Sequence, residues 1–354
     1  MEGWVKRYGG LGCGSGGNEV TKMPLVSIIV PAYNNGDIIE KSLLSLVNQR
    51  YPEKEIIVVY DEGSSDNTRE VLLRIRESFP DMVHVISTEH VGRSKARNLG
   101  WKSSRGEILF FADADDIYKE DYLEKAVKCL LSDSSFGGVT VTGTTLKLES
   151  NFVTNCMEVY SSIVRRLTDE GKIKPKWAWV YRREAVEKVG GFDERLSQAE
   201  DKDLYLRVME AGYSFGFVGG VNWWHTRRGK LFPYLKKCYA AGKRRIQFLI
   251  KYRDVRCFFY SVFLFWMFLI LLLLSPLFTP LLYIALGGLL AFFLYSLAIT
   301  LKLGWSAAPR KAYLFLYPIY SFMTYIATAV GYTYGFFLVL KEKYGGKSID
   351  WSLL

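Results

Sequence analysis

Apolar and mixed stretches alternate along the first third of the chain. Leu25 to Val30 is nearly all apolar and rich in β-branched residues, which is typical of a strand buried on both faces. Asp37 to about Gln49 follows with apolar residues at helical spacing. The alternation then repeats, predicting strands at 55–60, 82–86 and 107–111 and helices at 65–79 and 93–101. Strands and helices joined by short loops predict βαβ units, and therefore an α/β fold with a mostly parallel sheet.

The pattern is less regular after residue 116. It predicts a helix at 120–131, a strand near 139–142 and a helix near 159–167. A further helix follows Glu200-Asp201, and a short strand from Phe215 to Val218 is expected to close the domain. No internal repeat is visible, so one α/β domain accounts for this part of the chain.

The last third of the chain is much more apolar. Phe258 to Thr300 contains no charged side chain, which leaves room for two membrane helices, at 258–275 and 277–300, because one crossing needs about 20 apolar residues. Ala312 to Leu340 is also uncharged, and we expect it to cross as a third helix. That crossing would place the basic tail outside; a re-entrant or flat helix would keep it inside.

Charge changes the picture of where the first domain lies. The formal net charge is +10, but basic residues concentrate just before the first apolar span, which favours a membrane rather than a nucleic-acid partner. By the positive-inside rule the preceding domain is cytoplasmic. The expected divisions are a flexible leader at 1–23, a catalytic domain at 24–228, basic amphipathic interfacial helices at 229–257, transmembrane helices at 258–340 and a tail at 341–354. The five cysteines show no metal-binding or paired spacing and are expected to be free thiols.

Polar residues follow three of the predicted strands, at their carboxyl ends. They are Tyr33-Asn34-Asn35, Asp61-Glu62 and Asp113-Ala114-Asp115-Asp116. Ligands of parallel sheets bind beyond these ends. Clustered carboxylates repel one another unless a cation such as Mg²⁺ or Mn²⁺ offsets the charge, although an aspartate-rich turn that caps the next helix is the alternative.

A pyrophosphate and a nucleobase fit the other side chains at this edge. Asp61 can accept a hydrogen bond from a base N–H, and Arg93 or Arg97 can offset phosphate charge. A solvated helix face is the alternative interpretation of the two arginines. Asp116 is interpreted as a cap for the following helix.

Five segments in this order resemble the motifs of the family 2 inverting glycosyltransferases, from about Pro24 to His225. They are Ser27-Ile28-Ile29-Val30-Pro31-Ala32-Tyr33-Asn34, Asp61-Glu62-Gly63-Ser64-Ser65-Asp66, Gly92-Arg93-Ser94-Lys95-Ala96-Arg97-Asn98, Asp113-Ala114-Asp115-Asp116, and Gly190-Gly191-Phe192-Asp193-Glu194 with Glu200-Asp201. The resemblance implies a GT-A fold, a Rossmann-like, mostly parallel domain, here followed by an all-α membrane domain.

The resemblance also implies roles for single residues. Asp201 matches the catalytic base, which takes the proton from an acceptor hydroxyl. Asp113 and Asp115 are expected to hold Mn or Mg, with His225 as a further ligand unless it is only a packing residue. The donor side comprises Pro31, Ala32, Tyr33, Asn34, Asp61, Glu62, Arg93, Arg97, Asn98, Asp113 and Ala114. The acceptor side comprises Gly191, Phe192, Glu200 and Trp224.

Two departures from the family pattern narrow these expectations. Asp61-Glu62 stands where the family usually has two aspartates, which leaves the base of the donor open. The Gln-x-x-Arg-Trp motif of processive synthases is absent near the first membrane helix, where the chain reads Trp223-Trp224-His225-Thr226-Arg227-Arg228, so processive synthesis is not expected.

The sequence therefore predicts a membrane-bound enzyme that moves a sugar from a nucleoside-diphosphate sugar to a hydroxyl of a lipid-linked saccharide or glycolipid. Transfer to a polyisoprenyl phosphate is the alternative, because such an acceptor is already anionic and needs no base. A non-catalytic scaffold or nucleotide-sugar sensor is a second alternative. The expected partners are the donor, the lipid-linked acceptor and the bilayer, with oligomers left open and no nucleic acid.

Overall fold

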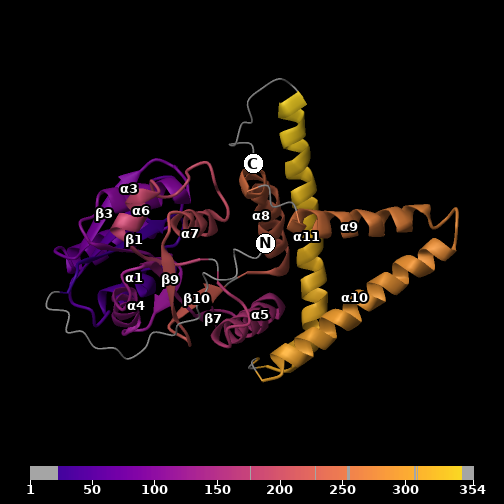
Figure 1. The fold of residues 1–354 in the computed structure, drawn as a ribbon, viewed down its shortest axis with the longest axis horizontal. Helices are drawn as coiled ribbons and strands as arrows, with labels where there is room; N and C mark the ends of the chain where they lie inside the picture. The colour runs from indigo at the N-terminus through magenta and orange to yellow at the C-terminus, as the bar shows by residue number, and fades with distance from the viewer. Residues whose placement is uncertain are drawn as a thin grey trace. The chain divides into compact units, whose positions relative to one another are not determined.

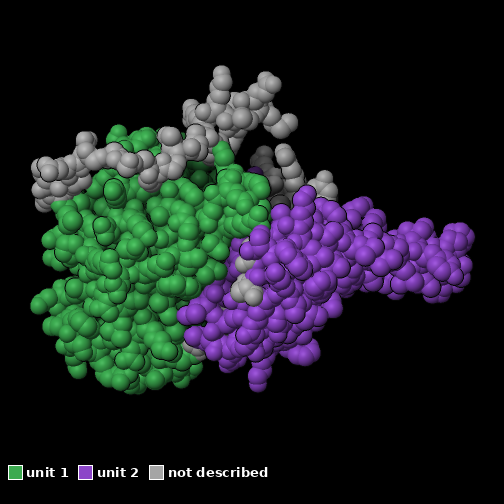
Figure 2. Space-filling view, turned by 90° about the horizontal axis from the view of Figure 1, so that it is seen from below, with its two compact units in different colours: residues 1–144, 165–226 green, residues 145–164, 227–354 purple. Residues whose placement is uncertain are grey.

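The computed structural model describes residues 23–175, 177–227, 229–252, 256–306, 308 and 310–344. The predicted leader up to residue 22 and the tail from residue 345 lie outside the described residues. The chain divides into two compact units, coloured separately in Figure 2. The first unit runs to Thr144 and includes Arg165–Thr226; the second holds Thr145–Val164 and the chain from Arg227.

The first unit, which contains the strands labelled β1, β3 and β9 in Figure 1, is built on a seven-stranded sheet with the strand order β3-β2-β1-β4-β8-β6-β9. Strands β1 to β4 are parallel to one another, whereas β8 is antiparallel to both of its neighbours. The bounds are β1 Val26–Ala32, β2 Lys54–Asp61, β3 Val83–Thr88, β4 Ile108–Phe111, β6 Phe136–Val141, β8 Val180–Arg182 and β9 Ser214–Val218. The predicted α/β class with a mostly parallel sheet is confirmed.

Helices accompany these strands, and the sequence predicted each of them except the short helix after β8. Their bounds are α1 Ile39–Val47, α2 Thr68–Ser78, α3 Arg93–Lys102, α4 Tyr122–Leu131, α6 Arg183–Lys188 and α7 Glu200–Glu210. Successive side chains of a strand point to opposite faces. Ile28 and Phe110 therefore join one apolar core, while Ile29 and Phe111 join the core on the other face. This two-sided burial explains why the central strands are apolar at consecutive positions.

Three short strands of the first unit escaped prediction, and β8 is one of them. Strand β5, Asp116–Tyr118, pairs antiparallel with β10, Trp223–Arg227. The prediction that Phe215–Val218 closes the domain is therefore wrong, because β10 follows it. The signal for β10 was present, since two tryptophans follow a pair of glycines, but its partner strand lies far away in the sequence.

The second unit is mostly helical, and it includes a segment that we predicted to belong to the catalytic domain. Helix α5, Phe152–Asp169, is longer than predicted, and its first part packs Val153, Cys156 and Met157 against Tyr320. This apolar contact explains why Thr145–Val164 groups with the C-terminal unit rather than with the sheet. The short strand β7, Thr144–Lys147, precedes α5.

Four further helices follow in the second unit. They are α8 Leu231–Tyr252, α9 Arg256–Leu274, α10 Pro280–Gly304 and α11 Ala312–Tyr344. Helices α10 and α11 are long and apolar enough to cross a bilayer, which suggests membrane association. The break between α9 and α10, at residues 275–279, contains the predicted break between the first two membrane helices. Cys156 and Cys238 are free, whereas Cys129 is disulfide-bonded, so the prediction of free thiols is wrong for that residue.

Candidate active site

The site lies at the carboxyl ends of β1, β2 and β4. Strand order runs outward from β1 to β3 and then returns to place β4 beside β1. Connections therefore leave in opposite directions on either side of β1, which is the switch point where open α/β sheets bind ligands. Ala32, Asp61 and Phe111 end the three strands, so the polar loops that follow them meet at one edge.

The acidic loop after β4 is held on both sides by hydrogen bonds. The backbone N–H of Asp116 donates to the Asp113 carbonyl oxygen at 3.2 Å, which closes a tight turn. From β10, the backbone N–H and the hydroxyl of Thr226 donate to the carbonyl oxygen of Asp115 at 3.0 and 2.6 Å. Strand β10 thus fixes the loop that carries the carboxylates.

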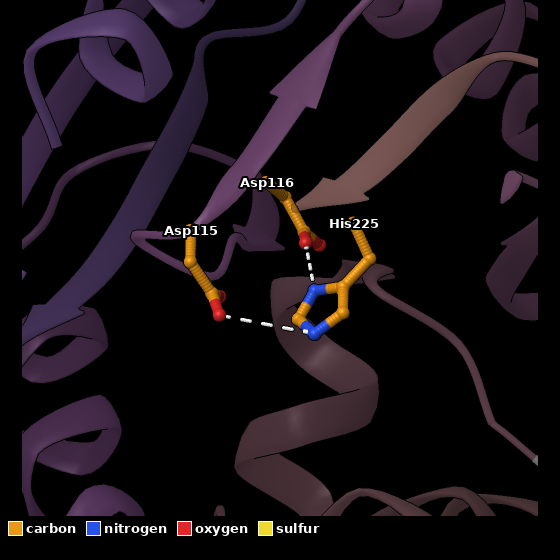
Figure 3. Close-up of side chains that lie close together, drawn as sticks. All are labelled: Asp115, Asp116 and His225. Atoms are coloured by element: carbon orange, nitrogen blue, oxygen red, sulfur yellow. Dashed lines mark hydrogen bonds and ion pairs between the residues drawn. The ribbon is translucent and has the colours of Figure 1, made fainter. Parts of the chain in front are cut away.

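Asp115, Asp116 and His225 come together at this loop (Figure 3). His225 lies directly opposite Asp116 in the β5–β10 pairing, and its Nδ1 is in hydrogen-bond contact with the buried Asp116 carboxylate. Its Nε2 faces Asp115 Oδ2 at 3.8 Å, which is too long for a direct hydrogen bond. The expectation that His225 joins Asp115 at the acidic cluster agrees with this geometry.

Asp116 has a different place from the one predicted. It lies in β5, and α4 begins only at Tyr122, so it does not cap that helix. Burial raises the pKa of the Asp116 carboxyl to about 7, although the facing His225 lowers it. The sequence missed Asp116 as a partner of the histidine because only the pairing of β5 with β10 brings the two together.

The residues of this group fit a divalent metal. One ligand atom from each of Asp115, Asp116 and His225 can be chosen so that all lie within 4.8 Å of one another. When Asp116 accepts a hydrogen bond from Nδ1–H, Nε2 keeps its lone pair, as in the carboxylate–histidine pairs that orient metal ligands. An imidazole beside a carboxylate suits Mn²⁺ better than Mg²⁺, which prefers oxygen ligands alone.

Asp113 is bound by a buried arginine rather than grouped with the other carboxylates. The Arg97 side chain has no exposed surface, and it donates to Asp113 Oδ1 at 2.7 Å and to Glu200 Oε1 at 3.0 Å. Its guanidinium also lies over the rings of Trp179 and Phe192. Burial alone would raise the pKa of Asp113, but the Arg97 and Arg93 charges outweigh it and lower that pKa.

This arrangement revises the expected roles at the donor side. Arg97 has no surface with which to contact a phosphate, so it joins Asp113 to the first turn of α7 instead. Arg93 is the exposed arginine of the pair, and its guanidinium lies 3.6 Å from Glu200. A metal-binding role for Asp113 remains a prediction, and so does a phosphate contact of Arg93.

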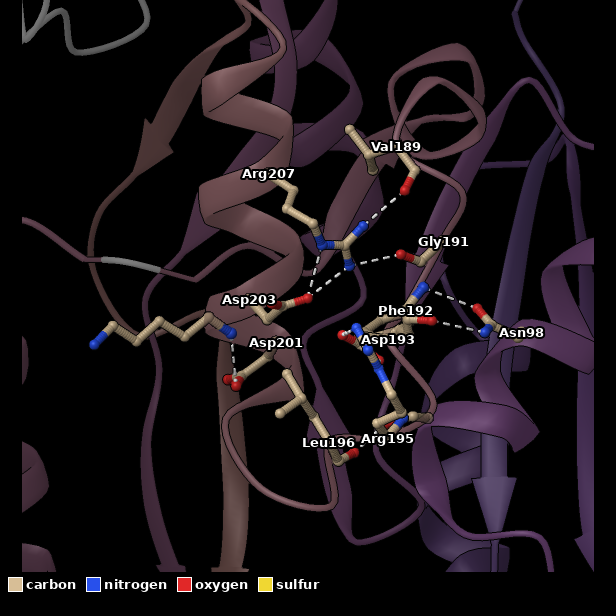
Figure 4. Close-up of polar contacts among 12 residues, drawn as sticks. Asn98, Val189, Gly191, Phe192, Asp193, Arg195, Leu196, Asp201, Asp203 and Arg207 are labelled. Carbon is tan, nitrogen blue, oxygen red and sulfur yellow. Dashed lines mark hydrogen bonds and ion pairs between the residues drawn. The ribbon is translucent and has the colours of Figure 1, made fainter. Parts of the chain in front are cut away.

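The Gly191-Phe192 segment is tied to α3 through Asn98 (Figure 4). The Asn98 amide donates to the Phe192 carbonyl and accepts from the Phe192 N–H, both at 2.9 Å. Gly191 has φ +79°, and a Cβ there would lie 2.6 Å from Asn98 Oδ1, so only glycine fits. Asn98 is buried and engaged in these contacts, so it does not face a donor.

Two aspartates in the first turn of α7 differ sharply (Figure 4). Asp203 is fully buried and forms an ion pair with Arg207 at 2.7 Å. The Asp201 carboxylate accepts a hydrogen bond from the neighbouring Lys202 N–H at 2.8 Å. Burial and, next, the Glu200 charge raise the pKa of Asp201, which makes this carboxylate a better proton acceptor than an ordinary aspartate.

The loop after β2 contacts a histidine that the sequence analysis missed. His90 Nδ1 lies 2.6 Å from Asp61 Oδ2, and the Gly63 N–H donates to the other carboxylate oxygen at 2.9 Å. The ring of Tyr33, half exposed, lies 5.0 Å from the His90 ring. Asn34, at φ +51°, accepts a hydrogen bond from the Ser65 N–H and joins the first two loops.

The other predicted residues lie around this edge. Ala32 and Ala114 are buried, Pro31 is partly buried and Glu62 is exposed. Trp224 lies in β10, and the Lys119 ammonium sits 5.8 Å from the centre of one of its rings. Whether these residues contact a donor or an acceptor remains a prediction.

Comparison with known proteins agrees with this fold and site. Residues 27–190 match the family model described as glycosyl transferase family 2. The chain is 32% identical over 232 residues to glycosyltransferase AglE of Haloferax volcanii, covering 64% of this chain and 74% of AglE. It is 26% identical over 277 residues to the probable glycosyltransferase YdaM of Bacillus subtilis, covering 70% and 64% of the two chains.

A solved structure shares the architecture. The mannosyltransferase PcManGT from Pyrobaculum calidifontis, in complex with GDP-Man and Mn²⁺, superposes with a TM-score of 0.58 at 23% identity, covering 89% of this chain and 88% of that one. The fold and its sheet edge thus define an α/β enzyme domain of the GT-A type. The chain belongs to glycosyltransferase family 2, and the expected glycosyltransferase activity is confirmed at that level.

Proposed function

We propose that this protein transfers a sugar, with inversion, from a nucleoside-diphosphate sugar to a hydroxyl group of a lipid-linked saccharide or glycolipid. The observation that carries the proposal is the arrangement of carboxylates at the sheet edge. Asp113, Asp116 and Asp203 each contact a basic side chain. Asp201 forms no ion pair with the residues that the structure describes, and its pKa is raised.

Asp201 acts as the general base in this proposal. The acceptor hydroxyl gives its proton to Asp201 while its oxygen attacks the anomeric carbon of the donor. The bond between that carbon and the diphosphate oxygen breaks, and the electron pair leaves with the nucleoside diphosphate. Attack from the face opposite the leaving group inverts the anomeric centre, and one base on that face is sufficient.

Asp115 and His225 would hold a divalent metal in this scheme, with Asp116 orienting the imidazole. Such a metal, when bound, offsets the negative charge on the departing diphosphate. The complex of PcManGT contains Mn²⁺ and GDP-Man, which makes Mn²⁺ with guanosine-diphosphate sugars the first combination to test. The choice between Mn²⁺ and Mg²⁺ rests on the imidazole, which favours manganese.

The same proposal places the catalytic unit on the cytoplasmic side of a membrane. The basic residues of α8 precede the apolar helices, and positively charged flanks stay in the cytoplasm. An acceptor carried on a lipid would then reach the site from the bilayer. A polyisoprenyl phosphate is the alternative acceptor, but it would leave the raised pKa of Asp201 without a use.

Membranes containing the protein provide the test. They are incubated with a panel of nucleoside-diphosphate sugars, with and without Mn²⁺, and the extracted lipids are analysed by mass spectrometry. We expect metal-dependent release of one nucleoside diphosphate and a matching gain of one sugar on a lipid-linked saccharide. A sugar found directly on a polyisoprenyl phosphate would overturn the proposed acceptor, and a scaffold would release nothing with any donor.

A further inference from the structure

Helices α8 and α11 run side by side in the second unit (Figure 1). Leu231 and Tyr234, near the start of α8, pack with Tyr320 of α11. Farther along, Ile246 and Leu249 of α8 pack with Tyr332 and Val339. Residue numbers increase in the same direction along the two helices, so the helices are parallel. Helix α8 packs against α11 over nearly the whole length of α8.

Glycines bring the two backbones into contact. Gly242 faces the backbone of Thr328, and Gly331 and Gly335 face the backbones of Tyr239 and Lys243. A side chain at Gly335 would put its Cβ 2.6 Å from the Lys243 carbonyl oxygen. The two helices are therefore packed backbone to backbone, which fixes the register of α8 along α11.

The face of α8 turned away from α11 is basic. Its exposed charged side chains are Lys236, Lys237, Arg244, Arg245 and Lys251. Tyr234 stacks on Tyr320 and Tyr239 lies against Tyr334, so Lys236 and Lys237 lie level with the middle of α11. If α11 crossed a bilayer, these two ammonium groups would be held near the hydrocarbon centre, where lysine is costly and too far from either surface to reach it.

The side chains of α11 also differ from those of a membrane-crossing helix. Hydroxyl-bearing residues recur along its length, from Tyr313 through Tyr325 to Tyr334. Tyrosines of crossing helices gather at the two interfaces instead. In α10, by contrast, the stretch from Ile284 to Leu294 has no polar side chain. The composition of α11 therefore matches residence in one interface along its whole length.

We propose that α8 and α11 lie together along the membrane surface, that the basic stripe of α8 contacts the phosphates of the lipid headgroups, and that only the α9–α10 hairpin crosses. The exposed apolar face of α11, which includes Ile319, Val330 and Phe337, then enters the outer part of the hydrocarbon. Two crossings return the chain to its starting side, so the C-terminus lies on the same side as the catalytic unit.

Spin labels on single introduced cysteines measure depth in reconstituted vesicles. Ile319, Val330 and Phe337 lie on one face of α11, and the outer two are separated by about 27 Å along the axis. Accessibility to oxygen, relative to a water-soluble nickel chelate, should be equal at all three. Labelling of the unsubstituted chain gives the background signal from its own cysteines. In α10, a label at Leu290 should lie deeper than labels at Leu282 and Ile299.

Two further measurements test whether α8 contacts the lipid headgroups and on which side of the membrane the C-terminus lies. A label at Lys237 should be relaxed by a nickel-chelating lipid headgroup, and a label at Leu290 should not. A protease-cleavable tag at the C-terminus should be cut from the side on which Lys95 of the catalytic unit is labelled, and Ser275 should be labelled from the opposite side.

Three results would overturn the proposal. In the first, the Val330 label lies as deep as the Leu290 label while the labels at Ile319 and Phe337 are shallow. In the second, headgroup nickel does not relax the Lys237 label. In the third, the C-terminal tag is cut only from the side on which Ser275 is labelled. None of these measurements requires sugar transfer. A failed activity assay would therefore leave them intact, and a failed depth measurement would leave the proposed reaction intact.

Discussion

The acidic loop and the first turn of α7 both present carboxylates to the same sheet edge, but the contacts of these carboxylates differ. In the loop, Asp113 and Asp116 are bound by Arg97 and His225, and the backbone is clamped by β10. In α7, Asp201 lies between the paired Glu200 and Asp203 and forms no ion pair with the residues that the structure describes. A carboxylate held by a neighbouring side chain is suited to holding position, whereas Asp201, with a raised pKa and no such partner among the described residues, is suited to taking a proton.

The largest effect should come from removing the proton acceptor. Asp201→Asn is expected to lower the transfer rate by about 100- to 10,000-fold, because general base catalysis contributes on that order. Donor binding, measured by titration calorimetry, should stay within about twofold, since the donor-side groups are intact. Asp81→Asn, at an exposed position, is the matched control. Equal losses of donor affinity and rate would place Asp201 on the donor side and erase the contrast.

Next in size is the loss of the buried arginine that joins the two regions. Arg97→Met should lower the free energy of unfolding by about 3–5 kcal/mol, because Asp113 and the buried Glu200 both lose their buried ion-pair partner. Arg93→Gln is the control, since the Arg93 side chain is mostly exposed and its loss leaves Glu200 paired with Arg97, so the expected cost is about 0–1 kcal/mol. Thermal unfolding of the purified protein in detergent measures both. Equal small losses would mean that Arg97 does not hold the regions together.

A smaller effect is expected from changing Asp116, which contacts the His225 ring. Asp116→Asn should raise the Mn²⁺ concentration for half-maximal activity by about 10- to 100-fold, as for other residues that orient a metal-binding histidine. Glu124→Gln, exposed on α4, should leave that concentration unchanged. If Asp116→Asn reduced only the thermal stability and not the metal requirement, the pairing of β5 with β10 would be structural alone.

The mildest test is the pH dependence of transfer. Burial raises the pKa of Asp201, and a base works only when deprotonated, so the rate should fall as pH falls through a value above the ordinary aspartate pKa of about 3.9. Initial rates at saturating donor and metal report this acid limb. Asp116 also has a raised pKa and could produce an acid limb of its own. The limb is therefore measured in Asp116→Asn, where it should persist if Asp201 is its source. A limb that vanished in that variant would belong to the acidic loop instead.

Local patterns determined the sheet and its edge. The central strands are buried on both faces, so their apolar runs were unambiguous, and the polar residues that follow them marked the site. The helical bounds were also close, as with the predicted helix at 93–101 and α3 at Arg93–Lys102. The alternation of strands with short loops and helices was sufficient for the α/β class, because it depends on periodicity over neighbouring residues.

Only the tertiary structure decided the partners of single side chains. His225 meets Asp116 because two short strands that are far apart in the chain pair with each other, and no local pattern records that pairing. Arg97 looked like an exposed phosphate ligand on a helix, but packing buries it between Trp179 and Phe192. The same holds in the second unit, where hydropathy alone describes α11 as a crossing helix. Its contact with the basic helix α8 is long-range and changes that interpretation.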